Sequence, residues 1–105
     1  MTPDPIFKAL SDPTRRALFE RLCQYGDQSV HALTTGAGIS QPAVSKHLAL
    51  LKAAGLVQGA AQGRETLYRA DPKALAALTD WVTFYSGFWE RKLDGLHDLL
   101  KRMDQ

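Results

Sequence analysis

The sequence predicts a mainly α-helical fold with one small β-hairpin and a long C-terminal helix. Three observations lead to this class. Helix start signals, in which a capping residue stands next to a proline or shortly before one, recur at Asp4, Asp12, Ser40 and Asp71. Two short extended runs flank a glycine-containing turn in the middle of the chain. Apolar residues recur every three or four positions over the last third. At 105 residues, a single domain is expected.

The first third of the chain predicts two short helices. Asp4-Pro5 is followed by apolar residues on one face, which indicates a short helix. Asp12 can cap the next helix, and Pro13 suits its first position because proline has no N–H to leave unpaired. That helix is expected to end at Gly26, since glycine readily adopts the backbone conformation of a helix terminus.

A helix-turn-helix is predicted over about residues 29–54. The first of its helices is short, because Thr34-Thr35-Gly36 are poor helix formers. Ser40 then caps a better helix over about residues 41–54, which is closed by Gly55. One side of this second helix carries apolar residues at the i, i+4, i+7 spacing of a core face, namely Val44, Leu48 and Leu51.

A hairpin and a long helix complete the chain. Over residues 56–70, Leu56-Val57 and Leu67–Arg69 are the extended runs, with the turn at residues 61–64. The helix over residues 72–103 has the alternating three- and four-residue steps of a helix that packs along its length against another. The expected dimer contacts, including one from the first helix, are Phe7, Leu78, Val82, Tyr85, Trp89, Leu96 and Leu100.

Positive charge is concentrated in the middle third of the chain. Residues 41–70 contain four basic residues and one acidic residue, so they carry a net charge of +3, whereas residues 1–40 balance to zero. A surface that faces phosphate groups is therefore expected in this middle segment.

Composition excludes several other classes. The single cysteine, Cys23, excludes an intrachain disulfide and a cysteine-rich metal cage within one chain. No apolar run approaches the ~20 residues that span a bilayer, and the first residues lack the apolar core of a secretory signal. A cytoplasmic protein without a membrane partner is expected. Local spacing supports no nucleophile–base pair, carboxylate dyad or phosphate-cradling loop, so an enzyme is not expected.

Three stretches together resemble the ArsR/SmtB family of dimeric winged-helix repressors. They are FKALSDPTRRALFERL at residues 7–22, SQPAVSKHLALLKAAGLV at residues 40–57, and the hairpin GAAQGRETLYRA that follows. The resemblance covers nearly the whole chain and implies one winged helix-turn-helix domain over residues 1–105. It further implies a homodimer that binds an inverted repeat in double-stranded DNA and blocks transcription.

The start of the second helix-turn-helix helix carries side chains suited to DNA. Gln41 can donate and accept at once, which suits adenine, while Ser45 can bond to either kind of base edge and Ala43 can meet a thymine methyl group. Arg64, at the hairpin tip, resembles a wing residue that reaches phosphates or the minor groove. The expected DNA-binding residues are Ser40, Gln41, Pro42, Ala43, Ser45, Lys46, His47 and Arg64.

Several of these residues also have a purely structural interpretation. Ser40 caps a helix in any fold. His47 lies beside the apolar face, so a half-buried structural histidine is as good an interpretation as a phosphate contact. For Arg15 and Arg16, a solvated surface position is favoured over a position near the DNA backbone.

The sensing function implied by the resemblance lacks its usual residues. The family's thiolate site, Cys-Val-Cys, aligns with Ser29-Val30-His31. For its second site the last helix offers Asp94, His97 and Asp98, followed by Lys101 where a ligand would be needed. No metal and no cofactor are therefore expected. Cys23 follows Leu22 on an apolar helix face and is expected to be buried and inert, although a bond to the same residue of a partner stays open.

Five aromatic residues cluster in the last helix, at positions 81, 84, 85, 88 and 89. A dimer core is the favoured interpretation, and a pocket for an apolar small-molecule effector is the alternative. Two other functions stay open. One is a metal- or thiol-responsive switch with unrecognised ligands. The other is a winged-helix interaction module without DNA binding, which the +3 segment disfavours.

Overall fold

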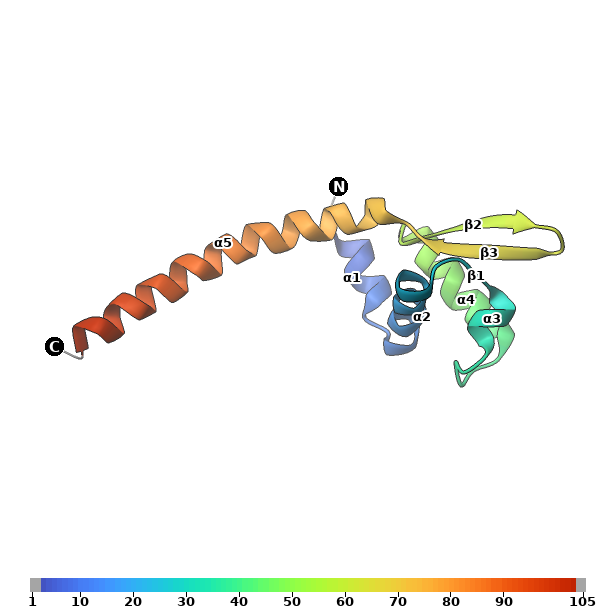
Figure 1. Cartoon of the computed structure of the whole chain (residues 1–105), viewed down its shortest axis with the longest axis horizontal. Coiled ribbons are helices and arrows are strands. Elements are labelled where there is room, and N and C mark those ends of the chain that lie inside the picture. The colour runs from blue at the N-terminus through green and yellow to red at the C-terminus, as the bar shows by residue number, and fades with distance from the viewer. Residues whose placement is uncertain (1–2, 104–105) are drawn as a thin grey trace.

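The computed structural model describes residues 3–103, and it has the predicted element order (Figure 1). The mainly helical class with a small sheet is confirmed. The elements are α1 (Asp4–Leu10), α2 (Pro13–Tyr25), β1 (Gln28–Ser29), α3 (Val30–Thr34), α4 (Gln41–Ala53), β2 (Val57–Gln62), β3 (Glu65–Ala70) and α5 (Pro72–Met103).

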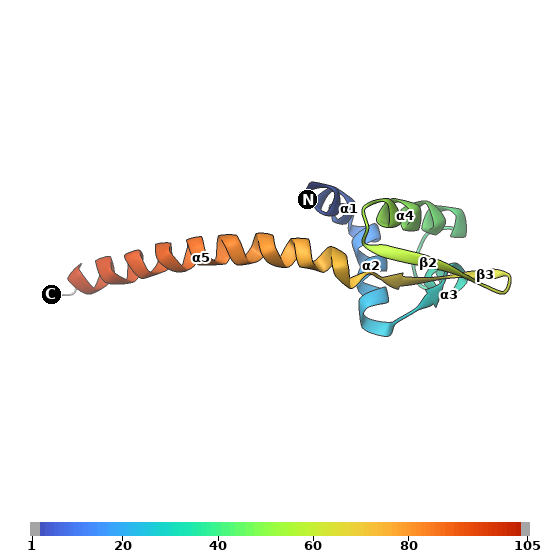
Figure 2. The same ribbon diagram turned by 90° about the horizontal axis from the view of Figure 1, so that it is seen from above.

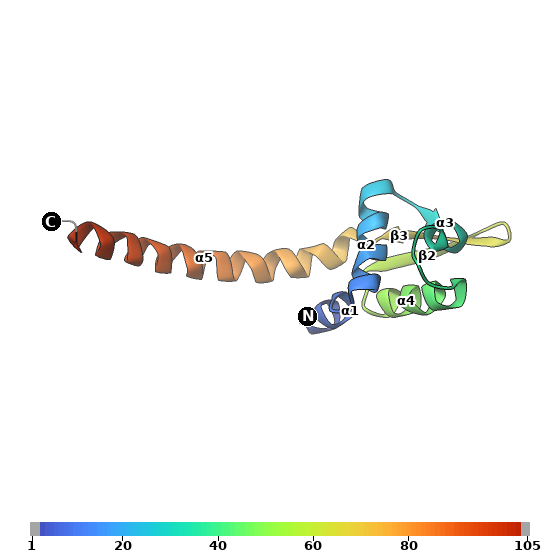
Figure 3. The ribbon, with the colours of Figure 1, turned by 90° about the horizontal axis from the view of Figure 1, so that it is seen from below.

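Helices α1–α4 and the sheet form a winged body, which is the part of the chain over residues 3–71. Figures 2 and 3 show α2 crossing the direction of α4, with the hairpin of β2 and β3 projecting beyond α3. The centre of this body is filled by branched aliphatic side chains at 2% exposure or less, namely Leu18, Leu22, Leu33, Val44, Leu48, Leu51, Leu56 and Val57. The predicted apolar face of α4 is therefore confirmed as a core face.

The helix termini follow the predicted capping signals. The Asp12 carboxylate accepts a hydrogen bond from the backbone N–H of Arg15 at 3.0 Å. That bond is the main cause that holds the pKa of Asp12 below its ordinary value. At the other end of α2, Gly26 has a φ of +82°, a left-handed conformation that residues with a Cβ adopt only at a cost.

The sheet has the order β1-β3-β2 and is antiparallel throughout. Gln62 pairs with Glu65, so only Gly63 and Arg64 form the turn, and the strands reach further toward the tip than predicted. A glycine with positive φ at the first of two turn residues suits a tight hairpin, and Gly63 has a φ of +63°. Strand β1 was not predicted, because two residues are too few for any periodicity.

Helix α5 leaves the winged body and extends alone, so the molecule measures 70 × 29 × 21 Å (Figure 1). Of its 32 residues, Ala74 is buried. The predicted dimer residues on α5 beyond Leu78 are exposed, with Val82, Leu96 and Leu100 at 51–52%. Within residues 3–103, no helix combines the length and the apolarity that crossing a bilayer requires.

Candidate nucleic-acid interface

The N-terminal turn of α4 is fixed by its own sequence. Ser40 has an extended backbone, and its hydroxyl accepts a hydrogen bond from the backbone N–H of Ala43 at 3.3 Å. Pro42 stands in the first turn, where its missing N–H has no helical partner to lose. Burial of Val44 then determines which side of the helix faces outward. As a result, Gln41 and Ser45 both point into solvent.

Helix α3 is tied to α2 by Arg21, an arginine of α2 that no local sequence pattern marks. The Arg21 guanidinium donates to the backbone carbonyl oxygens of Leu33 at 2.8 Å and of Ala32 at 3.1 Å. These carbonyls belong to the last turn of α3, which has no helical partners for them. At the other end of α3, the Ser29 hydroxyl accepts from the Ala32 N–H at 3.1 Å. The short helix is therefore fixed at both ends.

A hollow of about 230 Å³ separates the start of α4 from the hairpin. It brings together three of the predicted DNA-binding residues, Gln41 and Ser45 from α4 and Arg64 from the turn. Its complete lining is Ser29, Val30, His31, Gln41, Ser45, Arg64, Glu65 and Thr66. Hydrogen-bond donors and acceptors therefore face the hollow from the helices on one side and from the hairpin on the other.

His31 is a lining residue that the sequence analysis considered only as the replacement for a family thiolate. The structure places it exposed in α3, beside Gln41 and Arg64 in the hollow. The sequence offered one signal for this position. His31 is the second residue of the helix that Ser29 caps, so it lies in the first turn of α3. Its imidazole adds a group that can donate or accept a hydrogen bond to this surface.

The other predicted residues of α4 fall into two groups. Pro42 and Lys46 are exposed, whereas Ala43 and His47 are half-buried. The Nδ1 atom of His47 is buried and has no hydrogen-bond partner within the part of the chain that the structure describes. His47 therefore lies at the border between the core and the exposed side, as the structural interpretation expected.

Some basic side chains are hydrogen-bonded or ion-paired within the chain, and others are exposed without such a partner among the described residues. Arg15 donates to the Ala9 carbonyl oxygen at 2.7 Å and Arg16 to the Leu10 carbonyl oxygen at 2.8 Å, so both arginines hold the end of α1. Arg69 pairs with Asp27 at 2.9 Å. The exposed cations left in the central segment are Lys46, Lys52 and Arg64. The predicted positive surface is therefore narrower than the net charge of residues 41–70 suggests.

Cys23 is exposed, and the expectation that it is buried was wrong. The apolar side of α2 is carried by Leu18, Phe19 and Leu22, and the next residue turns outward. Partial desolvation of the sulfur raises the pKa of the thiol, and the nearby Glu20 carboxylate raises it further. Both effects disfavour the reactive thiolate.

Metal ligands do not gather in the part of the chain that the structure describes. Over residues 3–103, no group of three His, Cys, Asp or Glu side chains is placed to share an ion. Asp94 and His97 lie one turn apart on α5, where both are exposed.

Aromatic side chains of α5 contact one another and the first helix. The rings of Phe7 and Trp81 meet edge to face with centroids 5.0 Å apart, and Trp81 continues to Tyr85 at 4.6 Å. A second pair, Phe88 and Trp89, has its centroids 5.7 Å apart. Because Phe7 and Trp81 are still 38% and 41% exposed, this aromatic surface is only partly covered by its own chain.

The start of α4 is exposed beside the β2–β3 hairpin, and the opposite side of the helix-turn-helix packs on the core. This arrangement defines a winged helix-turn-helix protein of the DNA-binding class. Residues 12–58 match the family described as bacterial regulatory protein, arsR family. The HTH-type transcriptional regulator Rv2034 of Mycobacterium tuberculosis is 42% identical over 99 residues, which cover 94% of this chain and 89% of that regulator. The chain belongs to the ArsR family and is a DNA-binding transcriptional regulator.

Solved structures agree with this assignment. An ArsR-like transcriptional regulator from Rhodococcus sp. RHA1 aligns with a TM-score of 0.74 and 34% identity, covering 92% of this chain and 91% of that one. The homodimeric winged helix-turn-helix DNA-binding domain Mb0332 from Mycobacterium bovis has a TM-score of 0.65 and 28% identity, covering 80% and 77%. These relatives are regulators, which points away from catalysis.

Proposed function

We propose that the chain binds an inverted-repeat operator as a homodimer and represses transcription there. The observation that carries the proposal is the hollow that joins Gln41 and Ser45 of α4 to Arg64 of the turn. An α-helix fits the major groove, and its N-terminal residues meet base edges. Arg64 then lies on the side from which a wing reaches the adjacent backbone or minor groove.

Roles within this interface follow from side-chain chemistry. Gln41 pairs with adenine through its amide, while Ser45 and Ala43 read neighbouring bases. Lys46 and Arg64 neutralise phosphates, and His31 adds a contact to the backbone beside them. The Ser40 hydroxyl caps α4 and thereby aims these groups. The half-buried His47 positions α4 from its inner side.

A homodimer accounts for the exposed apolar residues of α5 and Phe7. One of the similar solved structures, Mb0332 of Mycobacterium bovis, is described as homodimeric. A two-fold dimer presents two α4 helices, and these enter successive major grooves about 34–36 Å apart. The operator is then an imperfect inverted repeat, and an occupied operator blocks the polymerase.

Base selection with a pool of random duplexes tests the proposal. Wild-type protein is expected to select an inverted repeat. Gln41→Ala is expected to lose roughly 1–3 kcal/mol of discrimination at one position of each half-site. Gln24→Ala is the matched control, because Gln24 is an exposed helical glutamine outside the hollow. Unchanged base preference in Gln41→Ala would contradict the placement of α4.

Salt dependence separates the phosphate contacts from the base contacts. Lys46→Gln is expected to weaken all duplexes about equally and to reduce the slope of log K against log salt concentration by about 1. A protein that binds no duplex at any salt concentration would instead support the interaction-module alternative.

A further inference from the structure

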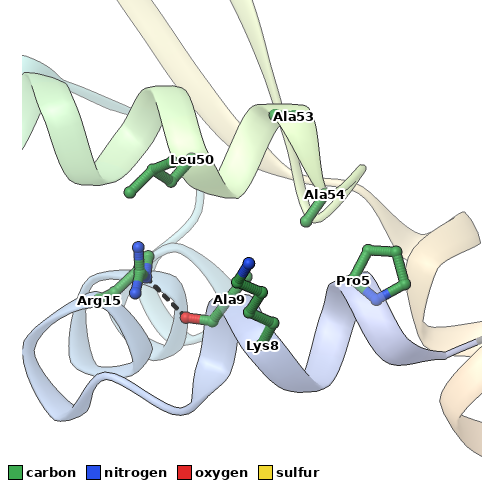
Figure 4. A pocket seen from close by; sticks show the side chains of 7 residues that line it. All are labelled: Pro5, Lys8, Ala9, Arg15, Leu50, Ala53 and Ala54. Atoms are coloured by element: carbon green, nitrogen blue, oxygen red, sulfur yellow. Dashed lines mark hydrogen bonds between the residues drawn. The ribbon is translucent and has the colours of Figure 1, made fainter.

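A second hollow, of about 320 Å³, lies between α1, the start of α2 and the C-terminal half of α4 (Figure 4). We call it the α1–α4 pocket. Figure 4 shows Pro5, Lys8, Ala9 and Arg15 on the side of α1 and α2, and the α4 residues on the opposite side. Those residues are Leu50 and Ala53 of α4 and Ala54 at its C-cap, so this side of the lining is apolar.

Among the described residues, neither cation of the α1–α4 pocket is in an ion pair, and the Asp12 carboxylate has only a minor Coulombic interaction with Arg15. Within residues 3–103 the one ion pair joins Arg69 to Asp27, so neither Lys8 nor Arg15 has a carboxylate oxygen within 4.0 Å. The Nε atom of Arg15 donates to the Ala9 carbonyl oxygen at 2.7 Å, which fixes the guanidinium at the pocket. Its two terminal nitrogens keep their N–H groups for another acceptor.

The chemistry of this lining specifies a class of ligand. Apolar walls favour an apolar body, and two adjacent cations favour an anionic head, which a guanidinium binds best as a planar carboxylate. A volume of about 320 Å³ lies at the small end of the range of roughly 300–1,000 Å³ for ligand pockets. We propose that the α1–α4 pocket binds a small monocarboxylate with an apolar body, of the size of octanoate.

The pocket stays accessible in the proposed homodimer. With 100° per residue, Phe7 projects from α1 about 150° away from the mean direction of Pro5, Lys8 and Ala9. A partner that covers Phe7 therefore leaves the pocket side of α1 uncovered.

The location of the pocket also connects it to DNA binding, a consequence that rests on the proposed function. One wall of the pocket is α1, and the ring of Phe7 in α1 contacts Trp81 of α5 with centroids 5.0 Å apart. Its other wall is α4, which reads the bases. A ligand that separates α1 from α4 therefore shifts α4 relative to the dimer helix, and the operator affinity changes with it.

Calorimetric titration of the full chain with octanoate, without DNA, tests the site itself. We expect one octanoate per chain and at least fivefold weaker binding of 1-octanol, which has the same body without the charge. Ala53→Leu fills the pocket and is expected to weaken octanoate at least tenfold. Ala53 is exposed and leucine is a good helix former, so the fold is retained. Circular dichroism checks that point.

Charge variants complete the test. Lys8→Gln is expected to weaken octanoate about fivefold, since an exposed charge contributes up to roughly 1 kcal/mol. Lys52→Gln is the matched control, because Lys52 is exposed on α4 but does not line the pocket. The proposal is overturned if octanoate does not bind, if octanol binds equally well, or if Ala53→Leu and Lys8→Gln leave the affinity unchanged.

A second arm measures operator affinity with and without octanoate. A change of at least threefold in wild type, absent in Ala53→Leu, supports the coupling. Octanoate that binds without changing operator affinity supports the site and overturns the coupling. Loss of DNA binding by the ligand-free protein would contradict the proposed function instead, while the calorimetric result for the pocket would still hold.

Discussion

Two helices of this molecule have similar apolar periodicity but different surroundings. The apolar side of α4, formed by Val44, Leu48 and Leu51, has no exposed surface. The apolar side of α5 is half exposed, with Val82, Leu96 and Leu100 at 51–52%. The spacing of apolar residues therefore predicts that a helix face is buried. It does not predict whether the same chain or another molecule buries it. In α4 the cover is the chain itself, and in α5 it is proposed to be a second copy.

The largest effect on stability is expected on the buried face of α4. Leu48→Ala should lower the free energy of unfolding by about 2–5 kcal/mol, because the fully buried side chain leaves a cavity among other aliphatic groups. Chemical denaturation monitored by tryptophan fluorescence and circular dichroism measures the loss. Leu50→Ala, at a 44% exposed position two residues on, is the control and should cost clearly less. Equal losses would show that the winged body is loosely packed.

The next effect concerns the face that is proposed to be covered by a second copy. Leu96→Glu should weaken the dimer by about 3 kcal/mol, or roughly 100-fold in Kd, because each dimer contains the change twice. Sedimentation equilibrium measures the dissociation. Thr83→Glu introduces the same charge on the opposite side of α5 and should leave the Kd nearly unchanged. A Leu96→Glu protein that still dimerises like wild type would exclude this stripe as the interface.

A smaller effect is expected at the helix caps of the winged body. Ser40→Ala removes the acceptor for the Ala43 N–H and should cost about 1 kcal/mol of unfolding free energy. Ser11→Ala is a suitable comparison, since the Ser11 hydroxyl donates to the Lys8 carbonyl oxygen at an exposed site. Surface changes of that kind stay within about 0.5 kcal/mol. If both variants behave alike in thermal melts, the Ser40 cap contributes nothing specific.

The smallest effect is a pH dependence at the start of α2. The pKa of Asp12 is lowered in the fold mainly by the hydrogen bond from the Arg15 N–H, with a smaller contribution from His47. The folded form therefore holds its proton less tightly than the unfolded chain. The stabilisation is fully present above the unfolded pKa and is lost as the pH falls through the folded one.

Asp12→Asn should accordingly flatten the decline of stability below about pH 4. Melting temperatures measured between neutral and acidic pH check this. Asp98→Asn, at an exposed position of α5 whose side chain makes no hydrogen bond within residues 3–103, should keep the wild-type slope. A wild-type slope in Asp12→Asn would mean that the cap does not titrate with folding.

Much of the winged body was predictable because its signals are local. Asp12, Ser40 and Gly26 mark helix ends through bonds or backbone angles within a few residues of themselves. The core face of α4 followed from spacing alone. The hairpin was predicted at the right place, but its turn is residues 63–64 and not the predicted residues 61–64.

What escaped prediction depends on contacts between distant residues. Arg21 holds carbonyls 11 and 12 residues further along, and no local pattern marks that pairing. Arg69 and Asp27 are 42 residues apart, so the charge count treated a paired arginine as available. The exposure of Cys23 depended on where the apolar side of α2 ends, which a single neighbour, Leu22, does not define. The candidate site gained His31 for the same reason.

The double use of Ser29 has a consequence for how the interface meets DNA. Its backbone pairs with Leu67 in β3, while its hydroxyl caps α3. The wing and the helix-turn-helix are thereby joined through one residue and cannot swing independently. Such a preformed shape loses little conformational entropy when a duplex docks. In the proposed complex with an operator, we expect such a stiff interface to fit a groove of the wrong width poorly and so to add to selectivity.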